Sequence, residues 1–358
     1  MPAIRSLLGK SLVAFAAALF LSAGASAQTE RRTLSGDDVA IYNLAGKLRV
    51  ESGSGSDVVV EISRGGRDGR QLQIEQGRIG RREALRVIYP SDRIVYPELE
   101  RSERVTVNLR DDGTWGDSRG RDVSDRERNR VQISNSGSGM EAYADVRVLV
   151  PRGQRIAIYH AVGEARVTTV DADLKVDVHN ANITAERTRG HLSLDTGSGS
   201  VSVTDAQGDV DLDTGSGSVT IAGIKGQTLH MDTGSGSIQG SDIDVGDLKA
   251  DVGSGGVKLE RVRASRVDVD AGSGGTELEL LSNIEQLKVD AGSGGVTVRL
   301  PASLNATVDI ETGSGGIETD FAVQVTRVEQ RHMVGKIGDG RGRIRIESGS
   351  GHVRLLKG

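Results

Sequence analysis

The chain has 358 residues and a formal net charge of −5, and this excess of acid opposes a large nucleic-acid interface, because phosphates require clustered positive charge. It contains no cysteine, which excludes disulfides, thiolate metal sites and lipid attachment through an N-terminal cysteine. Aromatic residues are 3% of the chain and glycine contributes 49 residues, a balance that fits thin stacked strands with glycine corners better than a large helical core.

The first 27 residues have the three parts of a secretory signal peptide. Arg5 and Lys10 supply a positive start, residues 12–21 form an apolar run, and residues 25–27 (Ala-Ser-Ala) form a small-residue cleavage site. An apolar run of about ten residues is too short to span a bilayer, which needs roughly 20. We therefore expect cleavage after Ala27 and export to the periplasm or the cell exterior, with no transmembrane segment in the mature chain.

Residues 28–110 contain short apolar or alternating runs that predict strands. Two of these runs, 41–50 and 58–62, flank a Ser-Gly-Ser-Gly-Ser loop at 52–56. We expect this N-terminal β region to cap the first layers of a stack.

Residues 111–130 belong to a highly charged segment. Between Glu100 and Arg130 there are eight acidic and eight basic residues, with Trp115 and a few aliphatic residues to bury. Such a segment does not offset its ordering entropy, so we predict a flexible insertion. The alternative is a charged surface turn that orders against the cap.

Residues 131–358 are organised by a Gly-Ser-Gly triad that recurs every 18 to 21 residues. The triad starts at Gly197, Gly215, Gly234, Gly253, Gly272, Gly292 and Gly313, and returns at Gly349. Apolar residues alternate with polar ones on both sides of each triad, as at Leu192 and Leu194 before it and at Val201 and Val203 after it. Each repeat therefore contributes two short strands that pair in parallel with those of the next repeat. The sequence predicts an all-β fold, a parallel β-solenoid of about ten to twelve rungs of 18–21 residues.

The two ends of this domain are less regular. Degenerate rungs are expected near His160 and Asn180, and one more, with Gly335, Gly338, Gly340 and Gly342, is expected to fill the 36-residue gap before Gly349. The chain stops at Gly358 directly after a strand pattern. We expect the C-terminal rung to stay exposed, to meet a partner, or to self-associate with another copy.

The glycine loops do not have the spacing of a nucleotide-binding or hydrolase motif. No Gly, Lys or Thr stands at the later offsets that phosphate-binding loops require, and no helix pattern follows. We interpret the glycines as residues with positive φ at a tight corner and the loop serines as a stacked hydroxyl ladder. The six histidines are scattered, and we interpret them as surface polar positions.

A carboxylate precedes each loop by two residues, and these carboxylates are the candidate metal ligands. They are Asp195, Asp213, Asp232, Asp251, Asp270, Asp290 and Glu311, with Glu51 and Glu347 at the ends. Stacked like charges repel, so a row of calcium ions is one expectation. The alternative is that solvent, loop hydrogen bonds and basic residues of the neighbouring column compensate the charge. Because no rung departs from the column, we predict no catalytic residues, no cofactor and no enzyme activity.

Basic residues gather in two clusters, one at 64–86 and one at 336–357. Such clusters suit an anionic envelope polymer, or protect the terminal strands from edge-to-edge aggregation.

The signal segment, the Asp145–Gly153 stretch (DVRVLVPRG) and the repeated Asp-Thr-Gly-Ser-Gly-Ser-Val resemble the bacterial DUF4097 family, described as adhesins with β-strand repeats. The likeness covers about 40–358 apart from the charged insertion. It implies an exported, non-enzymatic envelope adhesin or scaffold that binds an envelope protein or polysaccharide through long flat faces. The alternatives are a polysaccharide-binding or polysaccharide-cleaving β-helix and a calcium-stabilised structural protein.

Overall fold

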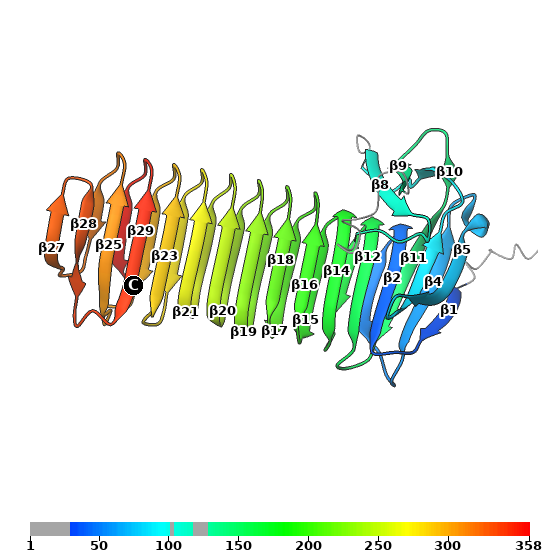
Figure 1. Ribbon diagram of the computed structural model, residues 1–358, viewed down its shortest axis with the longest axis horizontal. Helices are drawn as coiled ribbons and strands as arrows, with labels where there is room; N and C mark the ends of the chain where they lie inside the picture. The colour runs from blue at the N-terminus through cyan, green and yellow to red at the C-terminus, as the bar shows by residue number, and fades with distance from the viewer. Residues whose placement is uncertain (1–28, 101–103, 117–127) are drawn as a thin grey trace, which may run out of the picture.

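The computed structural model describes residues 29–100, 104–116 and 128–358, which form strands and one short 3₁₀ helix, η1 (Gly69–Gln71). The strands lie side by side along one long axis (Figure 1). The predicted signal peptide, residues 1–27, and the central part of the predicted flexible insertion, 117–127, lie outside the described residues. Within the described ranges, no helix has the length and apolar character needed to cross a bilayer.

Two rows of parallel strands form the walls of a solenoid-like stack, and successive strands of a row are neighbours in space. In spatial order the first wall contains β2 (Asp38–Ala45), β12 (Arg155–Val162), β14 (Asp173–Asn180), β16 (Leu192–Thr196), β18 (Val210–Thr214), β23 (Gln286–Ala291), β29 (Gly342–Ser348) and β25 (Ala306–Thr312). The second wall contains β3 (Leu48–Ser52), β13 (Ala165–Thr168), β15 (Ile183–Arg189), β17 (Val201–Gln207), β22 (Thr276–Leu280), β24 (Val296–Leu300), β30 (Val353–Lys357) and β26 (Ile317–Thr319). Between β18 and β23 in the first wall, and between β17 and β22 in the second, lie the halves of three long strands, β19 (Val219–Thr233), β20 (Ile238–Val252) and β21 (Val257–Ala271).

The alternation of the sequence decides which side chains the walls bury. In β16, Leu192, Leu194 and Thr196 point inward and are buried, whereas Ser193 and Asp195 are only partly buried on the outer face. The inward aliphatic side chains of both walls form one continuous core. Each buried Val or Leu contributes about 1.5–3 kcal/mol relative to an exposed one, so every rung (one strand of each wall) has its own share of the stabilisation.

The first corner between the walls is made by the Gly-Ser-Gly loops, and the reason for its glycines differs from our expectation. None of the loop glycines from Gly197 to Gly351 adopts a left-handed φ. A Cβ at Gly197 would lie 2.6 Å from the carbonyl oxygen of His179, and every later triad glycine faces the carbonyl of the preceding rung at less than 3.0 Å. The prediction of positive φ was therefore wrong, because glycine is needed here for close approach between rungs.

Threonine residues on the inner side of this corner tie several of the loops to the neighbouring rung, whereas Val252, Ala271 and Ala291 stand at this position in three other loops. The buried Thr214 hydroxyl donates to the Gly199 carbonyl oxygen at 2.7 Å and accepts from the Gly217 N–H at 3.0 Å. Thr233 repeats both bonds one rung later. Serine hydroxyls such as that of Ser273 donate to the serine carbonyl of the preceding rung, at 3.3 Å to Ser254, which is the expected hydroxyl ladder. The loop is thus held by side chains as well as by its backbone.

A second corner lies after the fourth residue of the second-wall strands, just past β13 and within β15, β17, β19, β20 and β21, and uses left-handed backbone. The residues at this position in successive rungs are Thr169, Arg187, Asp205, Gly223, Asp242 and Arg261, with φ between 54° and 70°. Five of the six are not glycine, so each carries a local backbone cost of about 1 kcal/mol or more. The bend is maintained by the parallel pairing of the rungs on either side.

The C-terminal end of the stack corrects two expectations. β27 (Gln324–Glu329) and β28 (His332–Ile337) form an antiparallel hairpin on β25, so the segment with Gly335 does not make a further parallel rung. The last rung, β29 with β30, lies between the β23–β24 and β25–β26 rungs. Self-association through the C-terminal rung is therefore wrong as predicted, because both strands of that rung already have a neighbour on each edge (Figure 1).

The N-terminal region extends both walls. The second wall continues through β11 (Tyr143–Val150), β4 (Val58–Gly65) and β1 (Thr29–Leu34), and the first through β6 (Arg82–Ile88) and β5 (Gln73–Ile79). A separate four-stranded sheet contains β7 (Arg93–Val95), β8 (Arg104–Arg110), β9 (Arg128–Ser134) and β10 (Met140–Glu141). Trp115, in the described segment 111–116 after β8, lies over the outer face of the first wall, where it meets the Tyr159 ring edge-on with centroids 6.1 Å apart.

Candidate functional site

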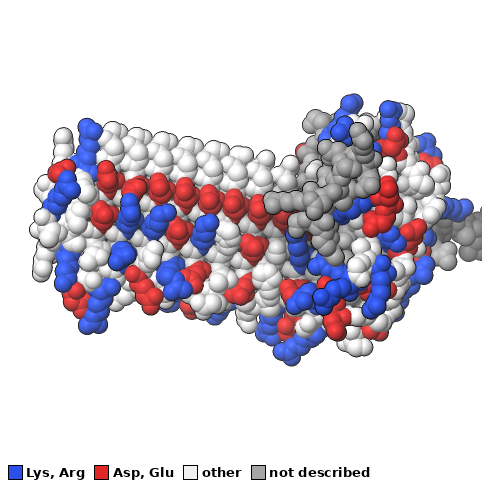
Figure 2. Space-filling model, in the orientation of Figure 1, with Lys and Arg blue, Asp and Glu red and all other residues white. Residues whose placement is uncertain are grey.

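The candidate metal ligands form one column on the outer face of the first wall. Strand register places Asp195 beside Asp213, and the column continues through Asp232, Asp251, Asp270, Asp290, Glu347 and Glu311. Figure 2 shows this column as a row of acidic side chains along the length of the stack. We call it the acidic column. Neighbouring strands lie about 4.8 Å apart, so each carboxylate has like-charged neighbours at close range.

Burial and mutual repulsion make several of these carboxylates harder to ionise. Burial raises the pKa of Asp232, and the charges of Asp213 and Asp251 raise it further. The pKa values of Asp195, Asp213 and Asp270 are also raised, with burial as the largest cause in each case. The acidic column is therefore a place of unfavourable charge in the folded state.

A second column, two residues before the acidic column in each strand, supplies partial compensation. His230 Nδ1 lies 3.2 Å from Asp211 Oδ1, and Lys288 Nζ lies 3.5 Å from Asp268 Oδ1, both within this second column. A base of this column pairs with a carboxylate of the acidic column toward each end, where Arg345 contacts Glu347 and Lys175 Nζ lies 3.8 Å from Asp177 Oδ2 in register with Asp195. The predicted pairing between columns is thus present toward both ends, while the positive charge of His230 and Lys288 is used within the second column.

The geometry does not assemble a metal-binding cluster. Among the described residues no group of three or more His, Asp or Glu side chains is placed to hold one ion. The seven candidate ligands are brought into one line, as the repeat predicted, but each rung contributes a single carboxylate. Cation binding by the column is therefore kept as the alternative hypothesis, for which a chelator is the test.

The acidic column begins one rung earlier than the sequence indicated and ends on aromatic rings. Asp177 pairs in register with Asp195, and the next position is Tyr159, whose ring stacks on Tyr42 with centroids 4.7 Å apart. Both tyrosines are 2% exposed. These rungs have no Gly-Ser-Gly triad, so the sequence analysis did not align Asp177, Tyr159 and Tyr42 with the column.

His160 is buried, which corrects its interpretation as a surface residue. Its side chain donates from Nε2 to the Gly46 carbonyl oxygen at 2.8 Å, and its Nδ1 lies 3.3 Å from Asn43 Nδ2, which donates to it. The Tyr89 hydroxyl is 2.9 Å from Asn43 Oδ1. Burial lowers the pKa of His160 to about 4, so the imidazole is neutral at pH 7. This network replaces the glycine loop in the first two rungs, because the hydrogen bonds close the corner there.

Comparison with known proteins identifies the family. The model of the Toastrack DUF4097 family matches residues 103–356, well over half of the chain. The chain belongs to this family. No curated protein matches the chain. A solved structure described as a "putative cell adhesion protein" from Clostridium sporogenes ATCC 15579 is 10% identical, covering 92% of this chain and 99% of that chain with a TM-score of 0.17. A superposition this poor carries no argument about fold or function.

Proposed function

We propose that this DUF4097 protein is an exported, non-enzymatic β-solenoid of the cell envelope that binds or scaffolds an envelope protein or polysaccharide through its long outer faces. The observation that supports the proposal is the rung-to-rung register, which repeats each outward position along the walls in straight columns. Such quasi-one-dimensional surfaces suit extended partners, because equivalent contacts recur at every rung.

The charges on the two outer faces indicate which kind of partner each face would bind. The first wall offers an unbroken acidic column beside a mixed column, which favours a partner with cationic groups at intervals. The second wall exposes uncharged polar side chains over its middle rungs, including Thr204, Thr220 and Gln239. The N-terminal segment 1–27 is proposed to direct export, with cleavage after Ala27.

The test uses the mature chain and two face variants in co-sedimentation with purified envelope material, namely isolated sacculi and outer-surface polysaccharide. The first-wall variant is Asp213→Asn with Asp232→Asn, and the second-wall variant is Thr204→Lys with Thr220→Lys. Arg341→Gln is the control, because its side chain is 86% exposed near one end of the stack. We expect one face variant to lose binding and the control to retain it.

Turnover would contradict the proposal. The polysaccharide fractions are therefore also assayed for new reducing ends and unsaturated products after incubation with the protein. Turnover that one Asp substitution abolishes would replace the proposal with the polysaccharide-cleaving alternative. Binding that both face variants leave unchanged would show that the long faces are not the binding surface.

A further inference from the structure

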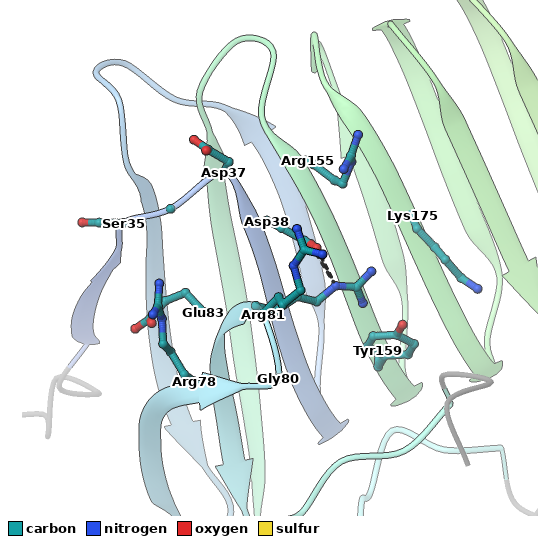
Figure 3. A pocket seen from close by; sticks show the side chains of 12 residues that line it. Ser35, Asp37, Asp38, Arg78, Gly80, Arg81, Glu83, Arg155, Tyr159 and Lys175 are labelled. Atoms are coloured by element: carbon teal, nitrogen blue, oxygen red, sulfur yellow. Dashed lines mark hydrogen bonds and ion pairs between the residues drawn. The ribbon is translucent and has the colours of Figure 1, made fainter. Parts of the chain in front are cut away.

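A hollow at the N-terminal end of the stack lies between the β5–β6 hairpin and the first wall. It has a volume of about 1050 Å³, and its lining comes from the β1–β2 connection, the hairpin, β12 and β14. Figure 3 shows Arg78 and Arg81 on the hairpin, and Asp38, Arg155 and Lys175 on the strands of the first wall. Segments that are distant in sequence thus build one concave surface.

Local turn chemistry places Arg81 at the rim of this hollow. Ile79 pairs with Arg82, so Gly80 and Arg81 are the two central residues of a tight hairpin. Gly80 has a φ of 61°, as the first central position of a type II′ turn requires. Arg81 occupies the second position, and its side chain is exposed at the tip. The turn therefore directs a guanidinium away from the core and toward solvent.

The lining carries more positive than negative charge. Its cationic side chains are Arg78, Arg81, Arg82, Arg155 and Lys175, and its acidic side chains are Asp37, Asp38 and Glu83. Two further acids beside the lining, Asp173 and Asp177, contact Arg155 and Lys175, so the positive charge available to a ligand comes from the cations that have no acidic partner. Clustered guanidinium groups bind oxyanions well, because their planar donor sets match phosphate oxygens in pairs.

Several of these cations are held in place by acidic partners, while others are not. Arg82 Nε lies 2.9 Å from Asp38 Oδ1, Arg155 Nε lies 2.8 Å from Asp173 Oδ2, and Lys175 Nζ lies 3.8 Å from Asp177 Oδ2.

In the described part of the chain, Arg78 and Arg81 form no ion pair, and both are exposed. The paired residues fix the shape of the site. The two unpaired arginines have donors available to a ligand.

We propose that this hollow binds a phosphate group that carries two negative charges, such as a phosphate monoester or a pyrophosphate. A phosphate monoester has a charge of about −1.5 to −2 at pH 7 and several acceptor oxygens, which suits the two unpaired guanidinium groups of Arg78 and Arg81 better than a singly charged carboxylate or phosphodiester does. The site is at one end of the stack, so it does not depend on the partner proposed for the long faces. The phosphate belongs either to a soluble phosphorylated molecule or to a lipid headgroup.

The experiment measures binding of inorganic pyrophosphate by titration calorimetry, and binding of phosphatidylcholine vesicles with and without phosphatidic acid by flotation. The pocket variant is Arg78→Gln with Arg81→Gln. The control variant, Arg31→Gln with Arg70→Gln, removes the same charge from exposed residues in the same N-terminal region that do not line the hollow. Far-UV circular dichroism verifies that each variant is folded.

We expect the pocket variant to weaken binding by about tenfold or more, because a hydrogen bond to a charged group contributes about 1.5–3 kcal/mol and 1.4 kcal/mol is a factor of ten. The control variant is expected to change binding by less than about twofold. Lys175→Gln, on the opposite side of the hollow, is expected to weaken binding as well, and it tests the site if the hairpin variant does not fold.

Binding of pyrophosphate assigns a soluble source, and binding of phosphatidic acid vesicles alone assigns a lipid source. Absence of binding to both probes would overturn the inference. So would an equal loss in the pocket and control variants, which would indicate non-specific attraction.

Discussion

Because the glycine loops of adjacent rungs pack closely, we expect alanine substitutions at two adjacent residues, Gly274 and Gly275, to have very different effects on stability. A Cβ built on Gly274 would lie 2.1 Å from the Gly255 carbonyl oxygen, whereas one built on Gly275 would lie 3.6 Å from its nearest atom, the Gly295 carbonyl oxygen. Because real Cβ atoms essentially never approach within 3.0 Å, Gly274→Ala must move the two rungs apart by about 0.9 Å. Gly275→Ala makes an ordinary van der Waals contact.

The magnitude follows from the hydrogen bonds that join these two rungs beside the loop. The Gly272 N–H donates to the Val252 carbonyl oxygen at 2.8 Å, and the Val257 N–H donates to the Gly275 carbonyl oxygen at 3.0 Å. A shift of about 0.9 Å takes both beyond hydrogen-bonding distance, at about 0.5–1.5 kcal/mol each. With the overpacking strain, we expect Gly274→Ala to lower the free energy of unfolding by about 2–4 kcal/mol. Gly275→Ala is expected to change it by less than about 1 kcal/mol.

Urea unfolding followed by far-UV circular dichroism measures both variants. Amide hydrogen exchange shows whether the loss is centred on the rungs around Gly274, as expected for a stack in which each rung contacts only its neighbours. Equal stability of the two variants would refute close approach as the reason for the triad glycines.

Three further predictions concern the charge of the acidic column, the protonation of His160 and the effect of a chelator. Asp232→Asn removes a repulsion of about 1 kcal/mol with each of the two stacked carboxylates, Asp213 and Asp251, so we expect it to raise the free energy of unfolding at pH 7 and low salt. The control variant Asp211→Asn removes the partner of His230, and we expect it to bring no gain in the free energy of unfolding. The raised pKa means that the folded state takes up a proton before the unfolded chain does, so the advantage of Asp232→Asn over wild type should shrink as the pH falls toward 3.8; an advantage that is constant with pH would contradict this account. The pKa of His160 is lowered to about 4, so between pH 6.5 and 4 the unfolded chain binds a proton that the folded chain does not. The free energy of unfolding of the wild type should therefore fall by up to about 3 kcal/mol across this window, and His160→Gln is expected to remove that fall in urea unfolding. A chelator is expected to leave the melting temperature unchanged, and a marked fall would instead support the calcium-stabilised alternative.

The sequence period was enough to predict the strands of the regular rungs and the acidic column. Alternation at Leu192 and Leu194 fixes which residues point inward, and equal spacing of the triads fixes which residues stack. These features depend on neighbouring rungs that are also consecutive in sequence.

The order of the rungs at both ends could not be predicted in this way. β29 lies between β23 and β25, and β12 pairs with β2 across more than a hundred residues. Because all copies of the repeat present nearly the same edge, the local pattern does not say which copy will be the neighbour. Long-range packing, and the β27–β28 hairpin that covers one edge of β25, determine which of these similar strand edges pair with each other.

The roles of side chains at the corners could not be predicted either, because they also depend on which rung lies next to them. In the sequence Thr214 is one of many small polar residues. Its role depends on the preceding rung, whose Gly199 carbonyl oxygen lies 2.7 Å from the Thr214 hydroxyl. His160 likewise becomes a buried residue only when Asn43 and Gly46 are placed beside it. The hollow proposed to bind phosphate takes Arg78, Arg81 and Arg82 from the basic cluster at 64–86 that the sequence shows, but Arg155 and Lys175 join them only when the hairpin is placed beside the first wall.

The central proposal is that the long faces of this solenoid-like stack bind an extended envelope partner. The most direct measurement is co-sedimentation of the mature protein with isolated sacculi and with surface polysaccharide, comparing wild type, the first-wall variant, the second-wall variant and the Arg341→Gln control at equal protein concentration. The account predicts that wild type and the control sediment with one of the two materials and that a face variant stays in the supernatant. Sedimentation of all four proteins to the same extent, or of none, would contradict the claim.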